Sequence, residues 1–108
     1  IGELYMDDRI VDYIVDIVEA TRNPTAAKLA DLVPLIEYGA SPRATLALAQ
    51  GSRAIAFLRD RAYVTPDDVK AIAPDVLRHR VLITYEAEAE DVTSDNIISR
   101  ILDAIPTP

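Results

Sequence analysis

The sequence predicts an all-α protein, a small helical bundle of about four main helices with at most a minor two-stranded β element. Three observations lead to this fold class. Apolar residues recur at three- and four-residue spacing, helix-capping residues precede these stretches, and only two short segments have the pattern of strands. With 108 residues, 50% hydrophobic and 27% charged, the chain has the size and composition of one globular domain, residues 1–108.

The first helix is predicted to begin at Asp7 or Asp8, either of which can cap it, and to end near Arg22 before Asn23-Pro24. Its apolar residues share one face: Ile10, Tyr13, Ile14, Ile17 and Val18. Its acidic residues lie on the opposite side: Asp12, Asp16 and Glu19. This amphipathic pattern predicts a surface helix with its apolar stripe in the core.

Two segments are less regular. Residues 26–32 are compatible with a short helical turn, and residues 33–38 are expected to be extended because of Pro34 and the bulky residues around it. Residues 81–90 alternate between apolar and polar positions, which favours a strand. A lone strand needs a partner, and 33–38 is the one other candidate for a small two-stranded element. A loop or short helix over Glu86–Glu90 is the alternative.

The second helix is predicted from Pro42 to about Arg61 and is apolar over most of its circumference. Such helices are usually buried on several sides, so we expect it to be the central element of the bundle. Gly51 in its middle costs about 1 kcal/mol relative to alanine. We expect another backbone to approach closely there.

Two more helices follow. Thr65-Pro66-Asp67-Asp68 combines a cap, a first-turn proline and a Thr-x-x-Asp variant of the capping box, whereas Pro74 predicts a break or kink. Thr93 or Ser94 caps the last helix, and Pro106 ends it. The predicted buried positions are Val69, Ile72, Ala73, Val76 and Leu77 in the third helix and Ile97, Ile98, Ile101, Leu102 and Ile105 in the last.

The formal net charge of −7 argues against general nucleic-acid binding, whose affinity depends on neutralising phosphates. The charge is unevenly distributed. Residues 1–42 carry three basic and eight acidic residues, residues 43–80 carry seven and four, and residues 81–108 carry one and six. The basic middle segment is either a solvated surface of mixed sign or a face turned toward an anionic ligand or acidic neighbour.

Several classes of site are excluded. Without cysteine there is no disulfide, thiol nucleophile or thiolate metal site, and His79 alone offers neither a triad nor a metal centre. Three glycines form no phosphate-cradling loop, and no calcium loop is present. The acidic pairs Asp67/Asp68 and Glu86/Glu88 are interpreted as capping and solvated groups. We therefore expect no metal and no complete catalytic site.

No apolar run of the sequence approaches the ~18 residues that span a bilayer, and its first residues lack the basic region of a signal peptide, so we expect neither feature in it. Because it lacks an initial methionine, we expect it to begin inside a longer gene product, and its lack of cysteine is compatible with the cytoplasm.

The segment Gly39-Ala40-Ser41-Pro42-Arg43-Ala44 is the strongest candidate site. Ser41 and Pro42 are a cap and a first helical residue, which places Arg43 in the first turn. A cation there opposes the helix dipole by roughly 0.3–1 kcal/mol. A helix start with a guanidinium fork is also a good receptor for phosphate or carboxylate. The alternative is that Arg43 points into water.

A second basic cluster is Arg78-His79-Arg80, which follows the third helix. Its charges complement the dipole at a helix C-terminus, and this alone accounts for them. The alternative is contact with a neighbouring domain or subunit.

Three segments in this order resemble the C-terminal lid of MoxR-type AAA+ ATPases: residues 39–44, Tyr63-Val64-Thr65-Pro66-Asp67-Asp68-Val69 and Val76-Leu77-Arg78-His79-Arg80. The stretch from Asp12 to Val18, followed by Ala20-Thr21-Arg22, fits the same lid, so the resemblance spans nearly the whole chain. It implies that the chain is a lid that follows a nucleotide-binding core. That core is not in this sequence, so no activity is expected of the isolated chain.

The resemblance implies that Arg43 is the sensor-2 arginine, which reaches the γ-phosphate of ATP held with Mg²⁺ by the core; the isolated chain is expected to hold neither. It makes Arg78, His79 and Arg80, and more weakly Arg22, candidates for an interface in a homo-oligomeric ring. It also implies chaperone-like remodelling of partner complexes, with von Willebrand A domain proteins among the partners. The alternatives are an autonomous helical interaction module and a small acidic regulator of a basic partner helix.

Overall fold

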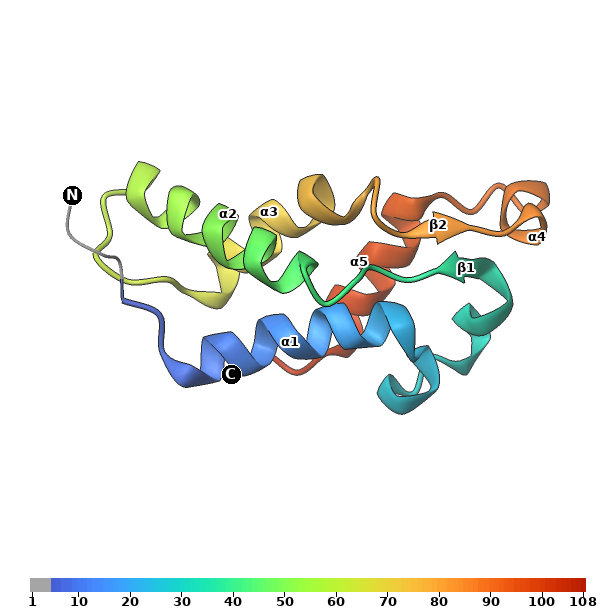
Figure 1. The fold of residues 1–108 in the computed structure, drawn as a ribbon, viewed down its shortest axis with the longest axis horizontal. Helices are drawn as coiled ribbons and strands as arrows, with labels where there is room; N and C mark the ends of the chain where they lie inside the picture. Colours follow the sequence, from blue (N-terminus) through green and yellow to red (C-terminus); the bar gives the residue numbers. More distant parts are fainter. Residues whose placement is uncertain (1–4) are drawn as a thin grey trace.

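A computed structural model describes residues 5–108 as an elongated helical bundle with extents of 46 × 22 × 21 Å (Figure 1). The fold class predicted from the sequence is confirmed. In chain order the elements are α1 (Asp8–Arg22), the 3₁₀ helices η1 (Pro24–Ala27) and η2 (Ala30–Leu35), β1 (Ile36–Tyr38), α2 (Ala44–Leu58), α3 (Pro66–Leu77), β2 (Leu82–Ile83), α4 (Tyr85–Ala89) and α5 (Ser94–Ala104).

Helix α1 begins and ends where the sequence predicts. The Asp7 carboxylate accepts a 2.8 Å hydrogen bond from the backbone N–H of Arg9, which satisfies one of the free donors of the first turn. All five residues of the predicted apolar face are buried, and the three acidic residues opposite are exposed. The amphipathic pattern therefore predicts correctly which face of α1 is buried.

The segment after α1 is more helical than predicted. Residues 33–35 belong to η2, so the expectation of an extended chain is wrong for them and right only for 36–38. Leu32 is 1% exposed and anchors the η2 turn in the core. This burial outweighs the weak local preference of Val33 and Pro34 for an extended backbone.

Both alternatives for residues 81–90 are present. β2 pairs antiparallel with β1, with Ile36 opposite Ile83 and Tyr38 opposite Leu82. The remaining residues form α4, which is capped by Thr84: its hydroxyl accepts from the Ala87 N–H at 3.1 Å and donates to the Pro34 carbonyl at 2.8 Å. The β1–β2 ladder and α4 form one end of the molecule (Figure 1).

Helix α2 differs most from its prediction. It is shorter than predicted, and only Ala44, Leu48, Ser52 and Ala56 are buried along it. Leu46, Phe57 and Leu58 are 67%, 53% and 75% exposed, so the prediction of a central helix buried on several sides is wrong. The core packs against one stripe of α2, since its buried residues recur every four positions and α2 contacts α1 and α3.

Gly51 of α2 lies where side chains of α3 approach the helix backbone closely. A Cβ at Gly51 would lie 2.8 Å from Cγ1 of Ile72 and 3.6 Å from Cγ2 of Val76, both on α3. The close approach that the sequence predicts is therefore present, but side chains of α3 make it rather than another backbone.

Helices α3 and α5 confirm the predicted capping. Thr65 with Asp68, and Thr93 with Asn96, form capping boxes. Helix α3 continues through Pro74, so a break at this residue is absent. Ala73 and Leu77 on either side of the proline are fully buried, and this packing holds the helix together without the hydrogen bond that Pro74 cannot donate. Of the predicted buried positions, Ile72, Val76 and Leu102 are partly buried and pack against the core, and the others are buried.

Candidate functional site

The loop from Gly39 to Arg43 joins β1 to α2 and carries the strongest candidate residue. The Ser41 carbonyl accepts from the Ala44 N–H at 2.9 Å, and the Pro42 carbonyl accepts from the Thr45 N–H at 3.1 Å. These short-range bonds form a tight turn, and the α-helix starts at Ala44. Ser41 and Pro42 therefore lie in the turn before the helix rather than at its cap and first position, and Arg43 is the capping residue.

Arg43 is exposed, and within residues 5–108 its side chain takes part in no hydrogen bond or ion pair. The backbone is held in the core three residues before Arg43, at Ala40, which is 1% exposed, and directly after it, at Ala44, which is fully buried. The arginine thus projects from a backbone segment that is fixed at both ends. An exposed guanidinium next to a helix N-terminus is suited to binding an oxyanion.

The loop is anchored on the last turn of α1. The Thr21 hydroxyl donates to the Val18 carbonyl at 2.6 Å and accepts from the Ala40 N–H at 2.9 Å. At Gly39 a Cβ would lie 2.2 Å from the Thr21 carbonyl oxygen, a distance that no side chain tolerates. The motifs at residues 20–22 and 39–44, which are separate in the sequence, therefore form one structural unit.

Sequence reasoning missed the part played by Thr21. Its position continues the apolar stripe of α1, three residues after Val18, and it is 1% exposed. A polar residue in an apolar stripe has to find hydrogen-bond partners in the interior. That signal was available in the sequence, although it does not identify Ala40 as the partner.

A second group of arginines lies just beyond the other end of α2. The Asp68 carboxylate is fully buried and accepts hydrogen bonds from Arg61, from Arg59 at 3.3 Å and from the Thr65 N–H at 2.8 Å. Burial alone raises the pKa of Asp68, but the bonds from Arg61 and Thr65 outweigh it and hold the pKa below its ordinary value. The interpretation of Asp68 as a capping group is therefore confirmed, and these arginines are structural.

The cluster that follows α3 is partly occupied by contacts within the chain. Arg78 pairs with Asp95 at 2.8 Å and with Asp75 at 3.2 Å, and the Arg80 side chain donates to the Val76 carbonyl at 3.1 Å. Asp95 and Asp75 raise the pKa of Arg78 further. His79 and Arg80 are exposed. Of the three candidate interface residues, Arg78 thus has a local role in joining α3 to α5.

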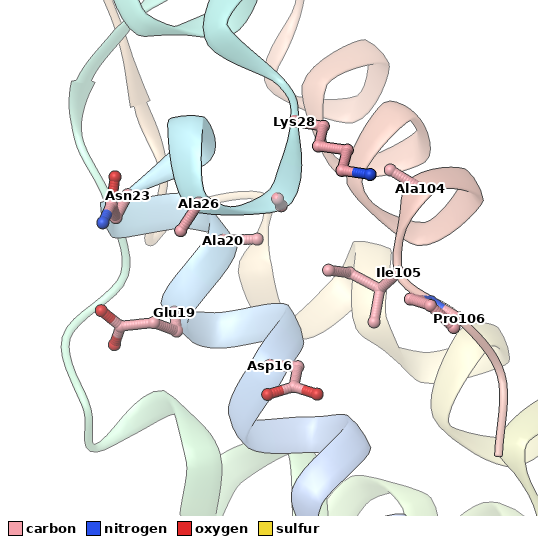
Figure 2. A pocket seen from close by; sticks show the side chains of 10 residues that line it. Asp16, Glu19, Ala20, Asn23, Ala26, Lys28, Ala104, Ile105 and Pro106 are labelled. Atoms are coloured by element: carbon pink, nitrogen blue, oxygen red, sulfur yellow. The ribbon is translucent and has the colours of Figure 1, made fainter.

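A groove of about 440 Å³ lies between α1, η1 and the segment after α5 (Figure 2). Ala20, Ala26 and Ile105 line it, with Asp16 and Glu19 on the side of α1 and Lys28 extending toward Ala104 on the other. A second groove, of about 340 Å³, is lined by residues that include Tyr5, Arg9 and Tyr63. Arg43 lines neither groove, so an oxyanion bound by its guanidinium would lie on an open surface.

Two further observations concern metals and membranes. Across residues 5–108, no three histidine, aspartate or glutamate side chains converge in a way that could hold a metal ion. None of the helices in the same range has the length and apolar composition required to cross a bilayer.

The chain matches known proteins over most of its length. Residues 31–101 match the family model of the AAA lid domain. The chain is 39% identical to the chaperone MoxR1 of Mycobacterium tuberculosis over 104 residues and 37% identical to the protein MoxR of Paracoccus denitrificans over 102 residues, which is 96% and 89% of this chain.

A solved structure is similar to this chain in both fold and sequence. The crystal structure of a candidate ATPase from Cytophaga hutchinsonii superimposes on 98% of this chain with a TM-score of 0.94 and 38% identity. The chain spans 28% of MoxR1, 30% of the Paracoccus protein and 32% of the Cytophaga protein.

Proposed function

Since this chain belongs to the AAA lid domain family and is of the MoxR type, we propose that it is the lid of an AAA+ ATPase in which Arg43 is the sensor-2 arginine. In this role the Arg43 guanidinium binds the γ-phosphate of ATP and stabilises the charge that develops during phosphoryl transfer. The observation that carries the proposal is the geometry of Arg43, which is exposed, adjacent to the start of α2 and unpaired within residues 5–108.

The residues of this chain fit one part of a nucleotide site. Arg43 and the positive end of the α2 dipole suit a phosphate oxygen. No carboxylate cluster of residues 5–108 suits Mg²⁺, so we assign the metal, the base and the ribose to a core domain of the same protein. One arginine at a helix start gives at best millimolar-scale affinity, because most of the contact area of the nucleotide lies elsewhere.

We further propose that the protein acts in the cytoplasm as a homo-oligomeric ring that remodels partner complexes, von Willebrand A domain proteins among them. Loss of the γ-phosphate would release Arg43 and let the lid rotate as a rigid body. MoxR1 of Mycobacterium tuberculosis bears the name chaperone, which supports the remodelling role. In such a ring, His79, Arg80 and Arg22 are candidate contacts with a neighbouring subunit, since all three are exposed.

The test is steady-state ATP hydrolysis by the intact parent protein carrying Arg43→Ala. Turnover at saturating ATP is expected to fall about ten-fold or more, because an interaction made in the transition state is lost. The matched control is Arg53→Ala, a second exposed arginine on α2, which should leave turnover unchanged. If Arg43→Ala hydrolyses ATP at the wild-type rate, the sensor role is wrong.

A helical interaction module without a nucleotide role is the second candidate function. Phe57 and Leu58, two adjacent exposed apolar side chains at the end of α2, favour it, since adjoining exposed apolar side chains are typical of protein contacts. Unchanged hydrolysis in Arg43→Ala together with loss of partner binding in Phe57→Ser would support this alternative.

A further inference from the structure

Thr21 lies on the buried face of α1 and bonds to the loop that carries Arg43. Within residues 5–108, no other polar side chain of that face does so. Its hydroxyl has one proton and two lone pairs. The proton goes to the Val18 carbonyl within the same helix, and a lone pair accepts the N–H of Ala40, a residue 19 positions away in the sequence. The first bond is available to many helical threonines, whereas the second requires this tertiary arrangement.

The loop has little freedom beyond this bond. Gly39 packs so closely on the Thr21 carbonyl that a Cβ would lie 2.2 Å from the oxygen. Ala40 and Ala44 are buried, Pro42 has a fixed φ, and the turn from Ser41 to Ala44 is closed by a 2.9 Å hydrogen bond. The backbone of Arg43 is therefore located by α1 on one side and by its own helix on the other.

We propose that Thr21 is a positioning residue for Arg43. The inference rests on the proposed sensor role of Arg43 and extends it to a residue that touches no nucleotide. A guanidinium contributes to a transition state only when its donors are within a few tenths of an ångström of the developing charge. The hydrogen bond from Ala40 to Thr21 fixes the loop relative to α1. The position of α1 therefore determines where the Arg43 guanidinium lies.

A purely structural hydrogen bond is the competing explanation, and it predicts loss of stability with no special dependence on Arg43. The experiment therefore compares two backgrounds. Thr21→Val, which has the same shape without the hydroxyl, and Thr21→Ser, which keeps it, are introduced into the intact parent protein with Arg43 and with Arg43→Ala. Turnover at saturating ATP, KM and the unfolding temperature are measured for each protein.

With Arg43 present, Thr21→Val is expected to lower kcat roughly three- to ten-fold with a smaller change in KM, and Thr21→Ser to restore most of it. In the Arg43→Ala background Thr21→Val should cause no further loss, because its effect passes through the arginine. Ser52→Ala is the matched control, since it removes a fully buried hydroxyl of α2 that bonds to no loop residue between 5 and 108. It should leave turnover unchanged.

Three outcomes would overturn the inference. An equal loss in both backgrounds would mean that Thr21 acts through stability alone. Full activity of Thr21→Val beside a strongly impaired Arg43→Ala would reject the positioning role and leave the sensor role intact. Full activity of Arg43→Ala would reject both. If valine prevents folding, Thr21→Ala provides the same comparison with a smaller side chain.

Discussion

The two ends of α2 use arginine in opposite ways. At the N-terminal end, Arg43 is exposed and has no charged partner within residues 5–108. Beyond the C-terminal end, Arg59 and Arg61 share the buried carboxylate of Asp68 at the start of α3. The second arrangement joins α2 to α3 and uses hydrogen-bond donors of both guanidinium groups on Asp68, whereas the first leaves the whole guanidinium free. Burial of a counter-ion, rather than the residue type, separates a structural arginine from a candidate sensor.

The largest expected effect concerns the Asp68 cluster. Replacing both partners (Arg59→Met with Arg61→Met) leaves a buried carboxylate without a cation and should lower the free energy of unfolding by about 3 kcal/mol. Arg43→Met, which removes an exposed side chain, should change it by less than about 0.5 kcal/mol. Urea unfolding of the 108-residue chain measures both. Equal losses would contradict the distinction between the two ends.

The next largest loss of stability is expected where the loop before the N-terminal end of α2 packs on α1. Gly39→Ala forces a Cβ against the Thr21 carbonyl and should cost about 2 kcal/mol, as overpacking does. Gly51→Ala meets side chains rather than backbone, with the Ile72 side chain the one in close contact, and the gain in helix propensity, about 1 kcal/mol, offsets that contact. Its stability should therefore stay within about 1 kcal/mol of the parent chain. Thermal or urea unfolding of the pair shows whether the backbone contact is essential.

The Asp68 cluster beyond the C-terminal end of α2 should make the stability of the fold depend on pH. Because Arg61 and Thr65 hold the pKa of Asp68 below its unfolded value, the carboxylate stabilises the fold above about pH 4, and this contribution is lost as the pH falls through the folded pKa. Asp68→Asn should begin less stable at pH 7 and lose less between pH 5 and pH 3. Parallel curves for the two proteins would exclude Asp68 as a source of acid sensitivity.

The smallest expected effect is at Asp60, which follows α2 in a left-handed conformation with φ of 58°. The Asp60 and Arg61 N–H groups bond to the Phe57 and Ala56 carbonyls at 3.0 Å, which is a Schellman motif. Asp60→Gly relieves the left-handed strain and should stabilise the chain by about 0.5 kcal/mol. A lower unfolding temperature would indicate that the Asp60 side chain stabilises the turn in another way.

Local sequence determined most of the helices and the candidate residue. The caps at Asp7, Thr65 and Thr93 and the apolar periods of α1, α3 and α5 act within a few residues, so they can be recognised without knowledge of the fold. The turn that precedes Arg43 is likewise visible as Gly39-Ala40-Ser41-Pro42, although the helix begins two residues later than expected.

Tertiary structure alone decided which surfaces and charges are used. The composition of α2 predicts burial on several sides, yet only the stripe that faces α1 and α3 is covered. The bond from Ala40 to Thr21 joins residues that are distant in the sequence, so no local rule predicts it. Alternation indicates a strand within 81–90, but the extent of β2 and its register with β1 depend on the fold. Capping and amphipathic period are properties of neighbouring residues, whereas burial and ion pairing depend on what the rest of the chain places beside a side chain.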